Sequence, residues 1–392
     1  MTVVTNWHLI TSEYPPRVGG VSDYSQLVAE GLVKAGDDVH VWCPPLPHVA
    51  VSNGVHIHPE LGRMTGKDLR SVGRLLDRFA SPRRLLVQWV PHGFGCRSMN
   101  LAFCIWIRRR ARRGDQIDVM VHEPYLAFWD GSLRQTAAAA VHRLMTIVLA
   151  SAASRIWVAI PMWERRWRPY ALGRGVAFEW LPIPSTLSVP TADGVRAVRE
   201  QYARAGTQIV GHLGTYGPAV VELLREALPA LLSASPSTVA LLLGQGGEAL
   251  RARLAADHPR LAARVLATGS LPHKDLARYV ACCDLLLQPY PDGVSTRRTS
   301  AMAGLALGVP IVTTTGHLTE PLWAETGAVV LVDVKNPETM AQEASRLLAD
   351  VSARRQLSAR GREMYERQFH LRHTIAALRR AALEPAACVS QF

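Results

Sequence analysis

The chain of 392 residues is poor in lysine, and the four that it has are Lys34, Lys67, Lys274 and Lys335. Its formal net charge of +12 is therefore carried almost entirely by arginine. A basic excess of this size favours anionic partners such as phosphates, although a general preference for arginine over lysine explains it equally well. Hydrophobic residues make up 48% and charged residues 19%, which excludes a disordered chain and indicates a well-buried globular protein.

Cysteine is also scarce, and its spacing matches neither a metal site nor a disulfide framework. Reduced thiols in the cytoplasm are the simplest interpretation. Thr2–Thr11 has the pattern of a core strand and not of a signal peptide. The longest apolar region, Leu144–Ile160, is interrupted by Ser151, Ser154 and Arg155 and is too short to cross a bilayer. We expect a cytoplasmic protein, with peripheral binding to the inner membrane face left open.

Strand and helix patterns alternate through both halves of the chain. Apolar runs such as Ala240–Leu243 indicate strands covered on both faces, and hence parallel sheets. We therefore predict an α/β protein with two Rossmann-like, doubly wound parallel-sheet domains facing a cleft. The expected strands are Val3–Ile10, Asp38–Cys43, Leu85–Val90, Asp118–His122, Arg155–Ile160 and Phe178–Leu181, then Gln208–Leu213, Val239–Gly244, Val265–Gly269, Asp284–Gln288, Pro310–Thr314 and Val329–Asp333.

The domain boundaries follow from changes in composition. Residues 1–184 form the expected N-terminal domain on the acceptor side. Residues 185–205 are predicted to be a linker, because this part of the chain begins with a segment that is rich in Pro, Ser and Thr and has no hydrophobic periodicity. Residues 206–368 form the second domain, and 369–392 are expected to form a helix that returns to the first.

Glycine follows several of these strands. Gly19 and Gly20 come after the first strand, Gly214 begins the loop Gly214-TYG in the second half, and Gly244 follows the next strand. Only glycine lets a backbone approach a ligand closely, and a helix N-terminus offers free N–H groups to an anion. One such turn is weak evidence, but several in both halves favour a phosphate-bearing ligand.

The segment Leu287-QPYPDGVSTRRTSAMAGLALGVPIVTTTG begins with an unusual feature. Ser295 or Thr296 is expected to cap a helix that stops at Gly308, which puts Arg297 and Arg298 in its first turn. Cations are unfavourable at that end of a helix dipole. An anionic ligand would make two arginines favourable there, and the alternative is that both face solvent as surface charge.

This segment resembles the donor-binding segment of the family 4 glycosyltransferases, in which two Glu residues eight positions apart precede Ala-Met-Ala and Gly-x-Pro-[IV]-[IV]. Ala301-MA and Gly308-VPIV match it. The resemblance implies the GT-B fold, transfer with retention, a nucleotide-diphosphate sugar as donor substrate, and no metal or other cofactor. Further matching segments follow in family order: Glu13-YPPRVGGVSDYS, Val121-HEP, Pro182-IPS, Gly244-QGGE and Gly269-SLPHKDLARYVACCDLLLQPY.

Three departures from the family pattern concern the donor site. Asp292 replaces the first Glu, and Ser300 replaces the second, which usually holds the ribose. The Arg and Lys that usually neutralise the diphosphate are missing from Gly214-TYGPAV. We therefore expect Arg297 and Arg298 to bind the diphosphate, with Arg298 the more important for catalysis.

The resemblance implies the remaining site residues. A His at the position of His122 contacts the donor sugar near its reacting carbon in this family, so His122 is the second expected catalytic residue. Glu123 either orients it or bonds within its own loop. The expected donor-binding residues are Gly19, Gly20, Gly214, Thr215, Tyr216, Gly244, Leu271, Asp292, Gly293, Val294, Ser295, Arg297 and Ser300.

The leading hypothesis is a retaining hexosyltransferase that acts on a hydroxyl of a small molecule, a glycan or a lipid-linked acceptor. Two alternatives remain: coupling of a nucleotide-activated cyclitol by a pseudo-glycosyltransferase, and a non-catalytic nucleotide-sugar-binding partner protein. The clusters Trp106-IRRRARR and Trp163-ERRWRPY suit either an anionic membrane surface, with Leu101, Ile105 and Trp106 as an apolar face, or solvated surface arginines. No nucleic-acid-binding module is recognisable.

Overall fold

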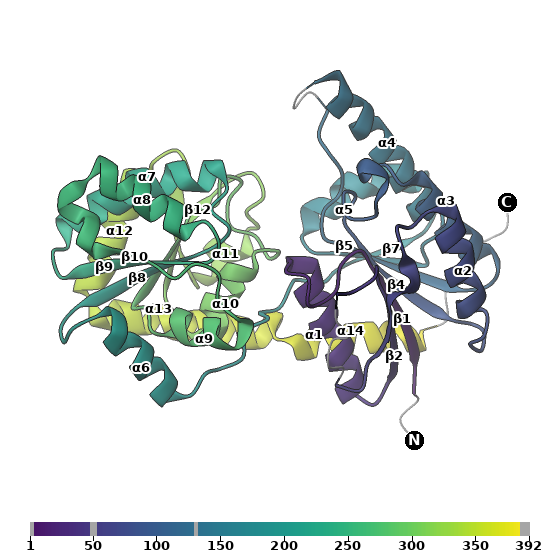
Figure 1. The fold of residues 1–392 in the computed structure, drawn as a ribbon, viewed down its shortest axis with the longest axis horizontal. Coiled ribbons are helices and arrows are strands. Elements are labelled where there is room, and N and C mark those ends of the chain that lie inside the picture. The colour runs from purple at the N-terminus through teal and green to yellow at the C-terminus, as the bar shows by residue number, and fades with distance from the viewer. Residues whose placement is uncertain (1–3, 48–52, 129–131, 385–392) are drawn as a thin grey trace. The chain divides into compact units, whose positions relative to one another are not determined.

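The computed structural model describes residues 4–47, 53–128 and 132–384. The first residue of the expected first strand, Val3, lies outside the described residues. The chain forms two compact units (Figure 1). Unit 1 comprises the chain up to Pro182 together with the segment from Leu371 onward, and unit 2 comprises Ile183–His370.

Unit 1 contains a seven-stranded parallel sheet in the order β3-β2-β1-β4-β5-β6-β7. The strand order reverses between β1 and β4, because the chain adds β2 and β3 on one side of β1 and β4 to β7 on the other. The strands are β1 (Asn6–Thr11), β2 (Asp38–Trp42), β3 (His56–His58), β4 (Arg84–Trp89), β5 (Gln116–Val121), β6 (Arg155–Val158) and β7 (Ala177–Trp180).

Helices cover both faces of this sheet, as Figure 1 shows. One face carries α1 and α14, which pack so closely that a Cβ added to Gly31 of α1 would lie 2.8 Å from Cδ1 of Ile375 in α14. Arg84 of β4 also donates to the carbonyl of Ala382. The helices of unit 1 are α1 (Gly20–Lys34), α2 (Gly66–Leu76), α3 (Leu101–Arg112), α4 (Leu133–Ala150), α5 (Pro161–Trp167) and α14 (Leu371–Leu383).

Unit 2 contains a six-stranded parallel sheet in the order β10-β9-β8-β11-β12-β13, which reverses between β8 and β11. Its strands are β8 (Gln208–Leu213), β9 (Thr238–Leu243), β10 (Val265–Ala267), β11 (Leu285–Gln288), β12 (Ile311–Thr315) and β13 (Val330–Asp333). Its helices are α6 (Ala192–Tyr202), α7 (Pro218–Ala234), α8 (Gly247–Asp257), α9 (His273–Ala281), α10 (Thr299–Leu307), α11 (Leu322–Thr326), α12 (Pro337–Ala349) and α13 (Val351–Met364).

Two hydrophobic cores, one on each face, hold the sheet of unit 2. Ile209 and Leu286 belong to the core under α9 and α10, while the next residues, Val210 and Leu287, belong to the core under α7 and α12. Successive side chains of a strand point to opposite faces, so a strand buried on both sides is mostly apolar. This is why Ala240–Leu243 of β9 and Leu285–Leu287 of β11 are apolar runs.

Every expected strand is present, with ends shifted by at most three residues. β3 was not predicted, because three residues, His56, Ile57 and His58, are too few to show an alternating pattern. It also missed α6 inside the expected linker. Thr191 accepts from the N–H of Gly194 at the start of α6, and Val198 is buried in the core of unit 2. One buried residue in a helix gives too weak a period to detect.

A cluster of imidazoles lies across β1, β2 and β3 of unit 1. Nδ1 of His40 lies 2.9 Å from Nε2 of His58, and His40 stacks on His8 at 5.2 Å. Burial and neighbouring imidazoles lower the pKa of His8 to about 3 and that of His58 to about 4, and burial lowers the pKa of His40. Arg83 adds to the effect on His8, whereas Asp38 opposes it.

We expect unit 1 to lose stability in acid because of this cluster. Its histidines stay neutral when folded but gain protons near pH 6.5 when unfolded. Their stabilising contribution is complete above pH 6.5 and declines as the pH falls towards about 4, by at most roughly 1.4 kcal/mol per pH unit for each of His8 and His58. Urea unfolding followed by tryptophan fluorescence measures this, because nine of the ten tryptophans precede residue 182.

His58→Gln keeps a hydrogen-bonding group beside His40 and should flatten the decline. The matched control is His258→Gln, which changes an exposed histidine of unit 2. Equal pH dependence in the wild type and the His58→Gln variant would contradict this account of the cluster.

Candidate functional site

The expected site residues of unit 2 gather at the carboxyl ends of its strands. Gly214 follows β8 and Asp292 follows β11, and these are the two strands between which the order reverses. In open parallel sheets, ligands bind at this switch point. The topology therefore brings together two loops that are about 75 residues apart in sequence.

Asp292, Arg297 and Arg298 form one ion-pair cluster in the loop between β11 and α10. Nη2 of Arg297 lies 2.6 Å from Oδ2 of Asp292, and Nη2 of Arg298 donates to the other carboxylate oxygen. The guanidinium of Arg298 also lies over the ring of Tyr290, 4.7 Å from its centroid. Both arginine side chains are more than three-quarters buried. They are therefore not ordinary solvated surface charges.

The helix after this loop begins later than the sequence predicts. α10 starts at Thr299 with Arg298 as its N-cap residue, so Arg297 and Arg298 precede the first turn. Neither Ser295 nor Thr296 caps it, because the N–H and hydroxyl of Thr296 donate to Oε1 of Glu320 at 3.0 and 2.6 Å. The expected cap was wrong for this reason.

Glu320 is a site-supporting residue that the sequence analysis missed. Its carboxylate is buried and also accepts from Nε1 of Trp323 at 2.8 Å. Burial raises the pKa of Glu320, against the effect of these donors. The contact with Thr296 spans 24 residues, and no local pattern marks such a pair. Removing the carboxylate would leave buried donors unpaired, and it would release the loop that carries the two arginines.

The residues between Asp292 and the arginines shape the loop with their backbone. Gly293 has φ +87°, and a Cβ there would lie 2.3 Å from the nitrogen of Gly316. The N–H of Val294 donates to the carbonyl of Thr314 at 2.8 Å, and both Val294 and Ser295 are fully buried. Both residues are therefore enclosed by the protein, backbone as well as side chain.

Ser300 does not stand free in the site. Its hydroxyl lies 2.7 Å from the hydroxyl of Tyr290. Burial raises the pKa of Tyr290 to about 12, so this phenol is neutral, and either hydroxyl can be the donor in this hydrogen bond. Whatever Ser300 offers to a ligand is one neutral hydrogen bond.

The glycine loops after β8 and β9 touch each other. Gly244 has φ +110°, and a Cβ there would lie 2.4 Å from the carbonyl oxygen of Gly214. Tyr216 is buried with φ +56°, and its hydroxyl lies 3.2 Å from the carbonyl oxygens of His212 and Leu243. Thr215 is exposed and Leu271 is half-buried. The close backbone contact already requires glycine here, with or without a ligand.

His122 follows β5 at the carboxyl edge of the sheet of unit 1. It is half-buried, with Nε2 2.9 Å from Oε1 of Gln88 and its ring against Tyr24 at 4.9 Å. Burial lowers the pKa of His122 to about 3, so the imidazole is neutral. With Gln88 accepting, the proton is on Nε2 and Nδ1 is the acceptor. Glu123 is exposed and pairs with His92 at 3.6 Å.

The N-terminus of α1 already has an anion. Gly19 is its N-cap residue, and Oε1 of Glu13 accepts from the N–H of Ser22 at 3.0 Å. A Cβ on Gly19 would lie 2.3 Å from that same oxygen, whereas Gly20 faces open space. The carboxylate of Glu13 thus occupies a position that the sequence analysis assigned to a ligand.

The two basic aromatic clusters have their tryptophans inside unit 1. Trp106, Trp163 and Trp167 are all buried, so of the expected apolar face only Ile105 is exposed and Leu101 half-buried. Arg110 is buried as well, and it bonds Asp115 and Asp77, each at 2.5 Å. Within the described residues, no helix is both long and apolar enough to cross a membrane.

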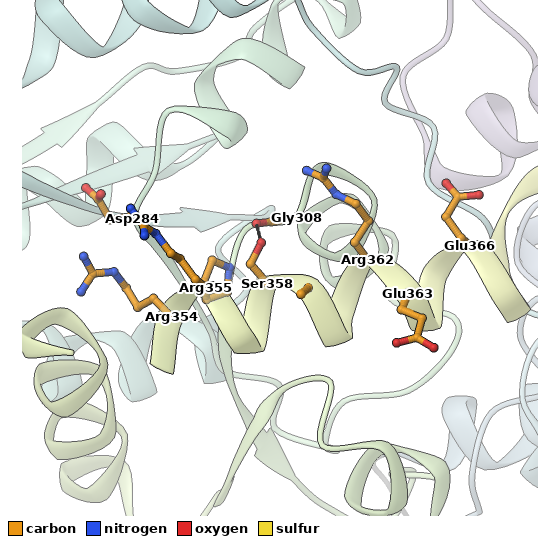
Figure 2. A pocket seen from close by; sticks show the side chains of 10 residues that line it. Asp284, Gly308, Arg354, Arg355, Ser358, Arg362, Glu363 and Glu366 are labelled. Carbon is orange, nitrogen blue, oxygen red and sulfur yellow. Dashed lines mark hydrogen bonds between the residues drawn. The ribbon is translucent and has the colours of Figure 1, made fainter. Parts of the chain in front are cut away.

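A pocket of about 610 Å³ in unit 2 lies at the other edge of the sheet (Figure 2). Asp284 and Pro310, which line it, precede β11 and β12. Ser358 of α13 donates to the carbonyl of Gly308 across it, as the dashed line shows. Arg354 donates to two backbone carbonyls at the end of α12. Ser358 and Arg354 thus hold α13 in place. The pocket lies away from the expected donor residues.

Comparison with known proteins supports these expectations at the level of class. Residues 207–350 match the family model described as Glycosyl transferases group 1. No curated protein matches the chain in sequence.

Three solved structures are similar over nearly their full length. Sucrose-phosphate synthase from Thermosynechococcus elongatus has a TM-score of 0.72 at 17% identity, covering 96% of this chain and 98% of that one. HepE from Anabaena, in complex with UDP and glucose, has a TM-score of 0.70 at 14% identity, covering 96% and 99%. WaaG, a glycosyltransferase involved in lipopolysaccharide biosynthesis, has a TM-score of 0.66 at 14% identity, covering 96% and 98%.

The predicted fold is thereby confirmed. Each of the two units is a parallel sheet covered by helices, as in GT-B glycosyltransferases. The family match thus covers most of unit 2, and the solved structures show that the whole chain shares their fold.

Proposed function

We propose that this protein is a retaining hexosyltransferase, which moves a hexose from a nucleotide-diphosphate sugar to the hydroxyl group of an acceptor. The observation that carries this proposal is the Asp292–Arg297–Arg298 cluster at the switch point of unit 2, inside the segment that matches group 1 glycosyltransferases. The resemblance to HepE, whose structure contains UDP and glucose, supports a uridine nucleotide as the first donor to test.

Arg297 and Arg298 would bind the diphosphate. One carboxylate balances two guanidinium groups here, so the cluster keeps a net positive charge. A diphosphate carries more charge than Asp292 and offers several oxygens to the two guanidinium forks. We infer that it displaces at least one arginine from Asp292. The freed carboxylate could then accept a hydrogen bond from a sugar hydroxyl.

The chemistry proposed for this site is stabilisation of the departing diphosphate. Fixed cations in a partly buried loop need little reorganisation as negative charge develops on the leaving group. His122, being neutral, would act through a hydrogen bond near the reacting carbon and not as a charged group. The resemblance to family 4 implies retention, with the leaving phosphate accepting the proton of the acceptor hydroxyl.

One observation favours a second candidate function. Ser300 is bound to Tyr290 and can offer only a neutral hydrogen bond where the family has a carboxylate. A weakened ribose contact would suit a donor that is held mainly by its diphosphate, such as a nucleotide-activated cyclitol. A non-catalytic nucleotide-sugar-binding protein would also tolerate Ser300.

A panel of nucleotide sugars tests the proposal with the purified full-length chain. UDP- and GDP-hexoses and a nucleotide-activated cyclitol are each incubated with sugar, sugar-phosphate and cyclitol acceptors, and free nucleoside diphosphate is measured. We expect release with at least one hexose donor. Release with the cyclitol donor alone selects the second candidate. Binding without any release would overturn the assignment as an enzyme.

For the arginine cluster, we expect Arg297→Ala/Arg298→Ala to weaken binding of UDP much more than binding of uridine. Each lost charge-assisted contact costs about 1.5–3 kcal/mol, or roughly 10- to 150-fold in affinity. Arg298→Lys should recover only part of this loss, because a point charge cannot replace a fork of N–H donors. Calorimetric titration measures both ligands.

Two controls accompany this titration. Arg251→Ala/Arg253→Ala removes the same charge from the exposed face of α8 and should leave the affinity for UDP unchanged. Asp292→Asn removes the carboxylate that competes for the arginines, so the affinity for UDP should hold or increase. Unaltered UDP binding by the Arg297→Ala/Arg298→Ala variant would mean that these arginines serve only the loop.

For His122, we expect His122→Ala to lower kcat by 100-fold or more while the Kd for the donor changes little. The reason is that a contact made mainly in the transition state affects turnover and not ground-state binding. His122→Gln, which can still bond Gln88, is the conservative variant. Normal turnover in the His122→Ala variant would leave the residue with a structural role beside Gln88 and Tyr24.

A further inference from the structure

Unit 1 contains a cavity of about 510 Å³ that belongs to none of the sites described above. It is large enough for a monosaccharide or a similar small molecule. The residues that line it are Ser12, Arg17, Pro44, Pro45, Gly62, Arg63, Met64, Gly93, Gly95 and Cys96. Its only charged lining residues are the two arginines.

The position of this cavity is that of a ligand site in an open parallel sheet. Ser12 follows β1, Pro44 follows β2, and Gly93 follows β4. The cavity thus lies at the carboxyl ends of the strands, where the order of unit 1 reverses between β1 and β4. Unit 2 has its arginine cluster at the equivalent switch point.

The walls of the cavity have an uncommon backbone. Cys96, Arg97 and Ser98 have φ angles of +49°, +52° and +71°, and Met64 on the other wall has φ +59°. Asn100 connects the two walls, since its Nδ2 donates to the carbonyls of Phe94 and Met64 at 2.7 and 3.1 Å. His142 lies 2.7 Å from the carbonyl oxygen of Ser98. Left-handed segments of non-glycine residues cost energy, and proteins retain them mostly at functional sites.

Arg17 and Arg63 are exposed residues at the rim of the cavity, and hydrogen bonds hold them there. The carbonyl of Arg17 accepts from the hydroxyl of Ser22 at 2.6 Å, and its guanidinium donates to the carbonyl of Pro45 at 3.2 Å. The N–H of Arg63 donates to Asp68 at 3.1 Å. Neither guanidinium has an ion pair with an acidic group among the described residues.

Asp68 accepts from the backbone of Arg63 and not from its guanidinium. Its Oδ2 also accepts from the N–H and the hydroxyl of Thr65, at 3.0 and 2.9 Å. These hydrogen bonds hold the pKa of Asp68 below its usual value. The carboxylate thus stays ionised and belongs to the capping box of α2, and it forms no ion pair with either guanidinium.

We propose that this cavity binds the phosphate group of a phosphorylated hydroxyl compound, with Arg17 and Arg63 contacting the phosphate oxygens. Two guanidinium groups match the two negative charges of a phosphate monoester. The proposal rests on the proposed function in one respect, namely that such a compound would be the sugar acceptor. Binding to the cavity itself involves unit 1 alone.

Cys96 provides a readout at the cavity without any nucleotide present. It is an exposed free thiol in the cavity wall, whereas Cys43, Cys104, Cys282 and Cys283 are buried. Alkylation by neutral iodoacetamide is followed by mass spectrometry of the Cys96 peptide in the full-length chain. Inorganic phosphate and glucose 6-phosphate should each slow it about tenfold at saturation, and glucose at the same concentration should not.

The variants assign the effect to the two arginines. Arg17→Ala/Arg63→Ala should weaken protection by phosphate at least tenfold in concentration, and Arg17→Lys/Arg63→Lys should retain part of it. Arg70→Ala/Arg74→Ala removes two exposed charges from α2 and should leave protection as in the wild type. Melting temperatures check that each variant is folded.

A lipid probe distinguishes a lipid headgroup from a soluble phosphate compound as the ligand. Protection by dihexanoyl-phosphatidylglycerol but not by glucose 6-phosphate would identify a lipid headgroup, and the reverse would identify a soluble phosphate. No protection by any probe overturns the proposal, as does equal loss in the Arg70→Ala/Arg74→Ala variant. Because the donor assays use nucleotide release, either proposal can fail while the other stands.

Discussion

A carboxylate that holds two guanidinium groups is the interaction on which the site of unit 2 depends. Asp292 keeps Arg297 and Arg298 together in a loop whose residues between them, Gly293 to Thr296, are buried. Without it, two like charges in one loop would repel each other until an anionic ligand took its place. Glu320 holds the same loop by accepting a hydrogen bond from the hydroxyl of Thr296. The loop is thus shaped by two carboxylates, and only Asp292 is in a position to exchange its partners for a ligand.

The same principle operates in unit 1, where Glu13 occupies the N-terminus of α1. In both units the protein supplies an anion at a place where the sequence predicts one from a ligand. Free N–H groups and buried cations need a partner in the ligand-free protein too. A sequence motif for anion binding therefore identifies the place, but it does not reveal which anion is there. A ligand at either place has to compete with a carboxylate already bound.

Much of the fold could be predicted because it depends on local sequence. A strand buried on both faces is mostly apolar, so the apolar runs within β9 and β11 predict these strands. The start of α10 could not be predicted, because Thr296 bonds a carboxylate 24 residues away instead of capping the helix. The ion pairs of Asp292 were missed for a different reason, since a motif defines which residues are near a ligand and not which of them bond to one another. Gly214 and Gly244 were predicted to bind a ligand, but the contact between their backbones alone explains why glycine is needed at Gly244.

The excess of arginine had two explanations in the sequence, and the structure gives each of them part of the chain. Arg83, Arg84 and Arg110 are buried and paired with Asp115 or Asp118, so these charges serve the core of unit 1. Their planar forks satisfy several acceptors at once, which lysine cannot do. Arg17 and Arg63 differ from them, because they lie at the rim of a cavity and no carboxylate pairs with them in the described chain. Total charge does not separate these two groups of arginines. What separates them is whether each arginine forms an ion pair with an acidic residue of the protein. At the switch point of unit 1, a phosphate would therefore bind without displacing any ion pair.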